Sequence, residues 1–152
     1  MNSALPDEVA IPEEYAELLT SAIHGTLSTI RAKDGLISTN PVSFLWDGER
    51  IRVSTLKSRV KYRNLAADPR VTFCVISPTD LTRYLEIRGQ ATLEDDPDGS
   101  FMRAQFRAGM GVDPPEDLDP PGAERAIIHI HPQQVSSPRI YGGRFERQAE
   151  GS

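Results

Sequence analysis

The stretch that decides the fold runs from residue 52 to residue 75 and reads RVSTLKSRVKYRNLAADPRVTFCV. Its two ends are rich in β-branched residues, which are typical of strands. Its middle, from Ser58 to Ala67, is predicted to be a helix that ends at Asp68-Pro69. The chain has a formal net charge of -5, yet residues 57–63 of this segment contain four basic residues: Lys57, Arg59, Lys61 and Arg63. Because like charges repel, the cluster indicates a binding site for an anion.

The order strand, turn, helix would make this segment suitable for a phosphate. The N-terminus of a helix offers free backbone N–H groups, and the hydroxyls of Ser54, Thr55 and Ser58 would lie nearby. Arg59 and Lys61 are predicted in the first helical turn, where cations are unfavourable to the helix dipole unless an anion is bound. Each charge-assisted hydrogen bond to a phosphate would contribute about 1.5–3 kcal/mol. The alternative is a solvated helix face, because Arg59 and Arg63 are i, i+4 neighbours.

Length and composition indicate one soluble domain over residues 1–152. Hydrophobic residues make up 38% of the chain and charged residues 26%, which excludes a disordered chain. The sequence pI of about 5.2 argues against a general nucleic-acid binder. No apolar run approaches the roughly 20 residues of a membrane span, and the acidic N-terminus lacks the features of a signal peptide. With a single cysteine the chain forms no internal disulfide, so we expect a cytoplasmic protein.

The N-terminal part is predicted to contain one short helix and three antiparallel strands. The helix covers residues 12–22, where Pro12 suits the first turn and apolar residues recur at helical spacing. The strands are expected near 25–32, 36–46 and 50–55, separated by the hairpin signals Asp34-Gly35 and Asp47-Gly48. Pro41 interrupts the middle strand and predicts a sheet edge or a bulge there.

Three further strands and one helix are predicted after the basic stretch. The strands cover residues 70–77, 83–94 and 124–135, with Gly89 marking a bulge or a close backbone contact. A helix is expected over 99–110, followed by a proline-rich acidic loop to Gly122, and the last ten residues are expected to be frayed. About six strands with few helices favour a closed β-barrel. The glycine loops of Rossmann and Walker nucleotide sites are missing from the sequence.

The run RVSTLKSRVKYRNLAADPRVTFCV, followed by YLEIRGQATL at 84–93, resembles a known family. It is similar to the split β-barrel flavin and deazaflavin oxidoreductases of the pyridoxamine 5'-phosphate oxidase superfamily. The likeness extends over about 12–142 and is greatest to the actinobacterial branch that uses the deazaflavin coenzyme F-420. The resemblance implies a mainly β, six-stranded split barrel with a few short helices. It also implies a homodimer with cofactors in two clefts between the subunits.

The resemblance also assigns cofactor-binding residues. Arg59 and Lys61 would form the phosphate clamp, helped by Ser54 and Thr55. The ring would lie along the second strand, at Asn40, Pro41, Val42 and Ser43. Lys57 and Arg63 would meet the polyglutamate tail of coenzyme F-420. Further contacts, partly across the dimer, are implied for Ser77, Pro78, Tyr84 and the segment from Arg139 to Tyr141.

The function implied by the resemblance is hydride transfer. Carbon 5 of the reduced deazaflavin would deliver hydride to an electron-poor conjugated substrate such as a quinone or an enone. The cofactor carries this chemistry, which accounts for a sequence without an acid, base or nucleophile arrangement. The proton would come from solvent or from Tyr84, the one candidate catalytic residue. Two alternatives stay open: an FMN-dependent oxidoreductase of the same fold, and a non-catalytic carrier of coenzyme F-420 or haem.

Two other features have competing interpretations. His129 and His131 lie on one face of a predicted strand, but no third and fourth ligand are spaced to complete a metal site. We therefore expect no metal and interpret them as ordinary strand histidines, or as residues that face a haem. The acidic loop from Val112 to Gly122 is either a lid over the cofactor cleft or a solvated connection.

Overall fold

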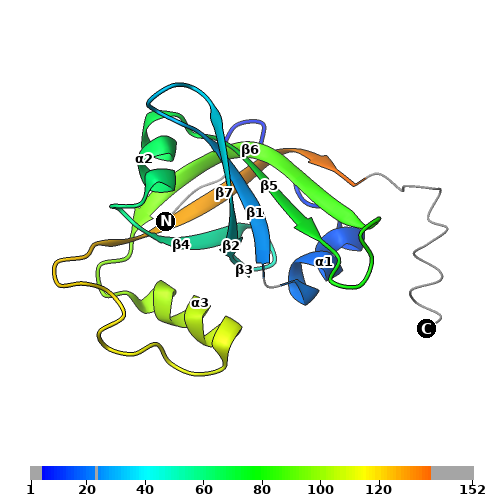
Figure 1. Cartoon of the computed structure of the whole chain (residues 1–152). Helices are drawn as coiled ribbons and strands as arrows, with labels where there is room; N and C mark the ends of the chain where they lie inside the picture. Colours follow the sequence, from blue (N-terminus) through cyan, green and yellow to red (C-terminus); the bar gives the residue numbers. More distant parts are fainter. Residues whose placement is uncertain (1–4, 23, 138–152) are drawn as a thin grey trace.

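The computed structural model describes residues 5–22 and 24–137, which form one curled antiparallel sheet with short helices around it (Figure 1). The strands are β1 (His24–Ile30), β2 (Ile37–Ser43), β3 (Leu45–Trp46), β4 (Ile51–Leu56), β5 (Arg70–Ile76), β6 (Tyr84–Asp95) and β7 (Arg125–Ser136). The helices are a 3-10 turn η1 (Glu13–Tyr15), α1 (Ala16–Ser21), α2 (Val60–Ala67) and α3 (Ser100–Met110). Among the described residues, no helix is long and apolar enough to span a membrane. The predictions for Arg139 to Tyr141 and for a frayed C-terminal tail lie outside the described residues.

The sheet has seven strands in the order β2-β1-β5-β6-β7-β4-β3, so β2 and β3 are its two edges. The predicted strand at 36–46 is in fact divided into β2 and β3, which is why the count exceeds the predicted six. The break comes at Phe44, which turns into the core and packs edge-on against Phe73, with ring centroids 5.1 Å apart. The chain therefore passes from one edge of the sheet to the other without hydrogen-bonding the two edges together. The barrel is split, which confirms the fold that the family resemblance implied; the prediction of a closed barrel from strand content alone was wrong.

Both predicted hairpin turns are present. Gly35 and Gly48 have φ angles of 75° and 95°, which glycine adopts without strain. Pro41 lies on the edge strand β2, as predicted. Gly89 lies at a register shift between β6 and β7, where a Cβ atom would come within 1.9 Å of the carbonyl oxygen of His131. The predicted bulge and close contact at Gly89 are both confirmed.

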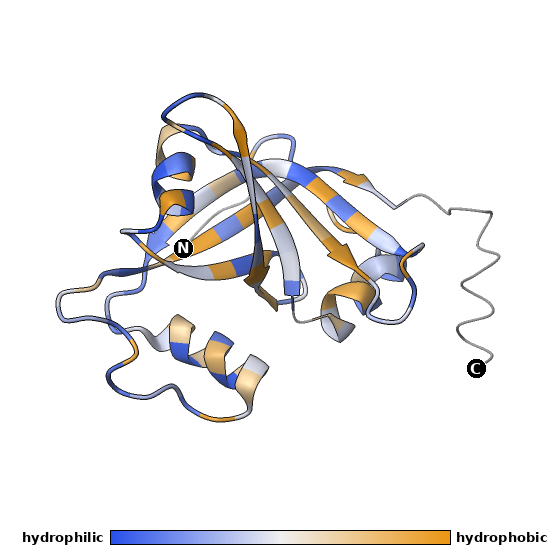
Figure 2. Cartoon of the chain, in the orientation of Figure 1, coloured by the Kyte–Doolittle hydropathy of each residue, from blue (hydrophilic) through white to orange (hydrophobic). Residues whose placement is uncertain are grey.

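The inside of the curled sheet is filled by alternate residues of the strands. Figure 2 shows the resulting alternation of hydrophobic and hydrophilic residues along the strands. The side chains at the centre are fully buried: Leu27, Phe73, Leu85, Ile87, Ile128 and Ile130. Leu18 and Leu19 of α1 join this core from one side. Burial of such side chains, each contributing about 1.5–3 kcal/mol, holds the strands in this arrangement.

The basic helix α2 is fixed to β1 by a buried amide. Asn64 Nδ2 donates to Thr29 Oγ1 at 3.1 Å, and Asn64 Oδ1 accepts from the backbone N–H of Ala32 at 3.2 Å. The helix starts at Val60 with Arg59 as its N-cap, two residues later than the predicted start at Ser58. The delay arises because a turn closes first, with the N–H of Arg59 bonded to the carbonyl of Leu56 at 3.0 Å. Lys61 is therefore in the first helical turn, but Arg59 precedes it.

Candidate functional site

A cavity of about 320 Å³ lies where the barrel is split, between β2 and β4; we call it the split-barrel cavity. β4 pairs with β3 only at Ile51 and Arg52, so the same edge of β4 has no strand partner from Val53 onward. The cavity is lined by residues of β2, β4 and β7 and by residues of α2 and α3: Pro41, Val42, Ser43, Val53, Ser54, Thr55, Leu56, Arg59, Lys61, Gln105 and Arg125. Open strand edges carry backbone hydrogen-bonding groups that a ligand can use.

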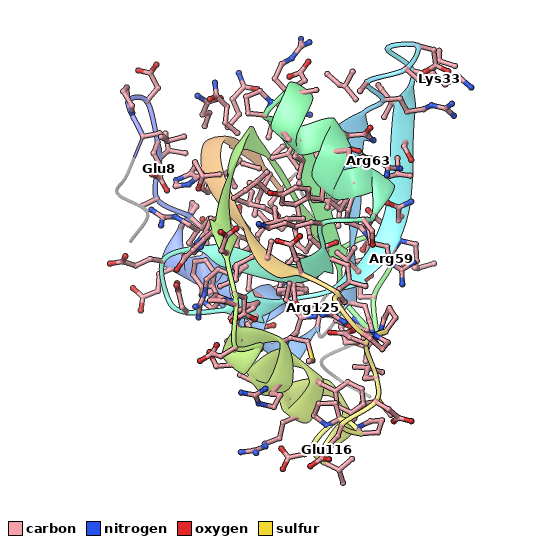
Figure 3. The ribbon with its side chains drawn as sticks, turned by 90° about the vertical axis from the view of Figure 1, so that its left-hand side faces the viewer. Glu8, Lys33, Arg59, Arg63, Glu116 and Arg125 are labelled. Carbon is pink, nitrogen blue, oxygen red and sulfur yellow. The ribbon has the colours of Figure 1, made fainter. Side chains whose placement is uncertain are left out.

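The split-barrel cavity is strongly positive although the protein is acidic. Its lining contains the three cations Arg59, Lys61 and Arg125 and no aspartate or glutamate; of the three, Arg125 is paired with Asp119 of the acidic loop. Figure 3 shows Arg59 and Arg125 in the region between α2 and α3, with Arg63 farther along α2. No acidic side chain among the described residues forms an ion pair with Arg59 or Lys61. An anionic ligand is what this arrangement is suited to bind.

The pKa of the Lys61 ammonium group is consistent with this excess of positive charge. Burial lowers the pKa of Lys61, and the positive charge of the neighbouring Arg59 lowers it further. A bound phosphate would reverse this effect, because a negative charge favours the protonated amine. Arg59 and Lys61 lie close together without an acidic partner in the described part of the chain, which indicates a binding site for an anion.

Two cavity residues, Gln105 and Arg125, escaped sequence reasoning. Gln105 of α3 accepts a hydrogen bond from the backbone N–H of Ser54 at 2.9 Å and so partners the open edge of β4. Arg125 is opposite Leu56 in the β4–β7 register, and its Nη1 donates to Ser54 Oγ at 3.4 Å. No local motif marks either residue, because both reach the cavity only through strand register and helix packing.

Seven of the residues implied by the family resemblance lie together in the cavity: Pro41, Val42, Ser43, Ser54, Thr55, Arg59 and Lys61. Asn40 is the adjacent residue of β2, paired with Leu27, and is not part of the lining. Lys57 is also outside the lining, because its Nζ lies 2.7 Å from Asp95 and 3.5 Å from Glu124. The hydrogen bond to Asp95 raises the pKa of Lys57.

The remaining predicted contacts are farther from the cavity within this chain. Tyr84 pairs with Ile76 at the end of the β5–β6 ladder, and Ser77 and Pro78 follow directly after β5. β1 and β5 separate these residues from β2 in the sheet order. Arg139 lies outside the described residues.

The histidines of β7 are paired with carboxylates. His129 Nε2 lies 2.7 Å from Glu94 Oε2, and burial lowers the pKa of His129. His131 is fully buried between Glu8 Oε2, at 3.1 Å from Nδ1, and Thr92 Oγ1, at 2.7 Å from Nε2. Within the described part of the chain, no three histidine, cysteine or acidic side chains gather as a metal site.

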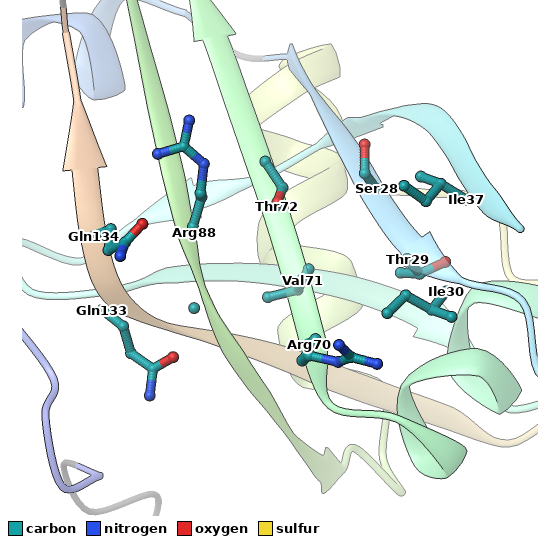
Figure 4. Close-up of a pocket in the computed structure, with 11 residues that line it drawn as sticks. Ser28, Thr29, Ile30, Ile37, Arg70, Val71, Thr72, Arg88, Gln133 and Gln134 are labelled. Carbon is teal, nitrogen blue, oxygen red and sulfur yellow. The ribbon is translucent and has the colours of Figure 1, made fainter. Parts of the chain in front are cut away.

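A second cavity, of about 400 Å³, lies on the outer face of β1, β5, β6 and β7; we call it the outer groove (Figure 4). It contains two arginines, but both already have acidic partners. Arg70 Nη2 is 2.7 Å from Asp68, and Arg88 pairs with Glu86. Small polar side chains such as Ser28 and Thr72 make up much of the rest. The outer groove is therefore less suited to an anion than the split-barrel cavity.

Comparisons with known proteins agree with this architecture. The chain matches the family described as pyridoxamine 5'-phosphate oxidase over residues 11–137. A solved structure named F-420 reductase is 37% identical, with a TM-score of 0.72 over 83% of this chain and 98% of that chain. A putative pyridoxamine 5'-phosphate oxidase from Listeria innocua shares the fold at 20% identity and a TM-score of 0.64, over 84% and 97% of the two chains.

A conserved hypothetical protein from Mycobacterium tuberculosis shares the fold at 22% identity and a TM-score of 0.68, over 93% of each chain. Among curated proteins, none matches the sequence. The family match covers the sheet, the basic helix and the whole split-barrel cavity. The chain thus belongs to the pyridoxamine 5'-phosphate oxidase family of split-barrel proteins.

Proposed function

We propose that this protein is a reductase that uses coenzyme F-420 and transfers hydride from the reduced cofactor to an electron-poor conjugated substrate. The observation that carries the proposal is the split-barrel cavity, with three cations and no acidic residue in its lining. The 37% identity to a protein named F-420 reductase supports the choice of cofactor. The family and the fold supply the broader class of oxidoreductase.

In this proposal the cofactor phosphate binds to Arg59 and Lys61. The hydroxyl of Ser54 and the open edge of β4 add hydrogen-bonding groups, and Arg125, which is paired with Asp119, borders the same site. The ring lies along Pro41, Val42 and Ser43 on β2, where a proline leaves the edge without a competing N–H donor. The bound cofactor supplies the hydride, while the chain orients it and excludes water from one face. The proton comes from solvent or from Tyr84 reached across the dimer, because Tyr84 of the same chain lies away from the cavity.

An FMN-dependent oxidoreductase is the alternative within enzymes. The FMN-binding protein from Nostoc punctiforme shares the fold at 16% identity and a TM-score of 0.63, over 88% of each chain. A non-catalytic carrier of coenzyme F-420 or haem is the alternative outside enzymes. The 37% identity to the protein named F-420 reductase favours coenzyme F-420 over FMN. Arg63 is exposed farther along α2 (Figure 3) and is suited to the carboxylates of the tail.

We further propose that the protein acts as a homodimer that uses the face of the outer groove. This face contains small side chains such as Ser28 and Thr72 beside Arg70 and Arg88, and large apolar residues are exposed on and near it. Ile37 is 73% exposed and Ile76 is 44% exposed. Exposed apolar groups of this size are typical of protein–protein contacts. Sedimentation velocity tests the dimer: Thr72→Arg on this face is expected to yield monomers, whereas Ala104→Arg at an exposed position of α3, outside the groove, is not.

A turnover assay tests the proposed function. Reduced coenzyme F-420 is mixed with menadione and catalytic amounts of protein, and reappearance of the oxidised cofactor absorbance is followed. We expect turnover with reduced coenzyme F-420 in air, because a reduced deazaflavin does not react readily with oxygen. Turnover with FMN alone would establish the FMN alternative. Tight binding of coenzyme F-420 without turnover of any quinone or enone would establish the carrier.

A further inference from the structure

Three cavities meet around one residue of α3. Ser43 and Gln105 line the split-barrel cavity and also two neighbouring cavities, of about 290 Å³ and about 300 Å³. The larger of the two neighbours also shares Ser54 and Arg125 with the split-barrel cavity. A molecule in that neighbour is therefore in direct reach of a ligand bound along β2 and β4.

This neighbouring cavity is built from apolar side chains, so we call it the apolar compartment. Its walls are Met102, Phe106 and Met110 of α3 and Leu118 of the acidic loop. Met110 is 67% exposed and Leu118 is 41% exposed, although apolar side chains of this size are normally covered. Methionine and phenylalanine are well suited to flat, polarisable ligands. The acidic loop thereby contributes a wall to a cavity, which a merely solvated connection would not.

We propose that the apolar compartment binds the hydride acceptor, and that the acceptor is an uncharged, planar, conjugated molecule of about two fused rings. This identification of the occupant as the acceptor rests on the proposed function. The size follows from a volume of about 300 Å³, at the lower end of ligand pockets, which span roughly 300–1,000 Å³.

The absence of charge in the acceptor follows from the charges around the compartment. Among the described residues, the one arginine or lysine in its lining is Arg125, which is already held by Asp119. Glu116 and Asp117 precede Leu118 and are exposed, so they repel an anion that approaches this wall. A charged acceptor would lose its hydration without gaining a partner.

Gln105 provides a polar anchor at the border of the compartment. Its Oε1 accepts the N–H of Ser54 at 2.9 Å, which orients the amide and leaves Nε2 as a donor. A carbonyl oxygen of a quinone or an enone is the acceptor that matches this donor. Gln105 is thus proposed as a positioning residue that places the conjugated ring beside Ser43, where the cofactor ring is expected.

Gly109 allows the compartment to be filled without strain. It lines the apolar compartment and the third cavity but not the split-barrel cavity, and a Cβ atom built on it meets nothing within 4 Å. Gly109→Trp therefore adds a large ring at the wall of the acceptor space. Ala104→Trp adds the same side chain to an exposed position of α3 that lines neither cavity and serves as the control.

Binding of menadione to the cofactor-free protein is measured by calorimetry for the wild type and both variants. We expect Gly109→Trp to weaken binding at least about tenfold, Ala104→Trp to leave it unchanged, and naphthoquinone sulfonate to bind more weakly than menadione. Gln105→Leu is expected to weaken menadione binding but not binding of naphthalene, which has no carbonyl. Affinity for coenzyme F-420 is measured in parallel and is expected to be the same in Gly109→Trp and wild type.

The outcomes separate this inference from the proposed function. Menadione binding that Gly109→Trp leaves unchanged, or preferential binding of the sulfonate, would overturn the inference. A change of oligomeric state in Gly109→Trp would also overturn it, because the compartment would then be a subunit contact. A third outcome separates the two proposals: Gly109→Trp loses menadione binding, and the wild type does not bind coenzyme F-420. That result would support the apolar compartment as the acceptor site and would overturn the proposed cofactor.

Discussion

Asp119 holds Arg125 through two parallel hydrogen bonds at the edge of the split-barrel cavity. Arg125 Nε donates to Asp119 Oδ2 at 2.8 Å, and Nη2 donates to Oδ1 at 2.6 Å. The same guanidinium reaches Ser54 Oγ with Nη1 at 3.4 Å. The acidic loop therefore neutralises one of the three cations that line the cavity. The hydrogen bonds from Arg125 in turn lower the pKa of Asp119. This pair sets how much positive charge an incoming anion meets.

Removing the charge of Asp119 is expected to strengthen anion binding. Asp119→Asn leaves the charge of Arg125 unopposed, so we expect affinity for the phosphate-bearing cofactor to increase about three- to tenfold at low ionic strength. Fluorescence titration at two salt concentrations measures this. Asp113→Asn is the matched control, because Asp113 pairs with Arg107 on the exposed side of α3. Equal effects of the two substitutions would show that the pair does not influence the cavity.

Cofactor affinity is expected to fall at alkaline pH because of Lys61. Burial and the adjacent charge of Arg59 lower the pKa of this amine, and only its protonated form attracts a phosphate. Affinity is therefore full well below that lowered pKa and is lost as pH rises through it. Titrations between about pH 7 and pH 10 measure this dependence. Lys61→Arg should bind with little pH dependence, and a similar decline in this variant would assign the effect to another group.

Asn64 is expected to be the polar side chain on which the position of α2 depends. Asn64→Ala leaves Thr29 Oγ1 and the N–H of Ala32 without their partner, so the free energy of unfolding should fall by about 1–3 kcal/mol. Urea denaturation measures the loss. Arg63→Ala, on the exposed side of the same helix, should change stability by less than about 0.5 kcal/mol. Stability that is equal in the two variants would contradict a structural role for Asn64.

Stability toward acid is expected to depend on Glu8. Burial alone would raise the pKa of Glu8, but hydrogen bonds from His131 and from the N–H of Leu5, with the charges of His131 and Arg50, outweigh it and lower the pKa. A carboxyl whose pKa is lowered on folding contributes stability above its ordinary pKa of about 4.5 and loses it as pH falls through the lowered value. The same direction applies to His129, whose pKa burial lowers.

Glu8→Gln is therefore expected to lower the free energy of unfolding by about 1–3 kcal/mol at pH 7. The difference from the wild type should narrow in acid, once Glu8 of the wild type is protonated. Urea denaturation at neutral and acidic pH measures this, with Glu13→Gln as a control at an exposed position of η1. A difference between Glu8→Gln and wild type that does not change with pH would contradict the role of the carboxylate charge.

Much of the fold was predictable from local signals. Asp34-Gly35 and Asp47-Gly48 mark turns because glycine adopts positive φ, and Asp68-Pro69 ends a helix because proline cannot continue it. The split of the barrel was predicted by the family resemblance but not by any local signal, since it depends on Phe44 turning into the core against Phe73. That contact is between residues far apart in the chain, and an alternating strand pattern gives no sign of it.

The candidate site was predictable only where local sequence signals mark its residues. Arg59 and Lys61 stand out because they are close together in an acidic chain. Lys57 belongs to the same cluster in the sequence, but strand register brings it to Asp95 and Glu124 instead of the cavity. Gln105 and Arg125 carry no local signal, because their positions depend on how α3 and β7 meet β4.

The central claim is that the split-barrel cavity holds the phosphate of coenzyme F-420 on Arg59 and Lys61. The most direct measurement is a fluorescence titration of wild type, Arg59→Ala/Lys61→Ala and Arg103→Ala/Lys33→Ala with oxidised coenzyme F-420, FMN and haemin. Two lost charge-assisted hydrogen bonds at about 1.5–3 kcal/mol each predict an affinity for coenzyme F-420 reduced at least about 100-fold in the first double variant. The second double variant, which removes as many charges outside the cavity, should bind nearly as the wild type does. Equal affinity in the wild type and the Arg59→Ala/Lys61→Ala variant, with both folded, would contradict the claim.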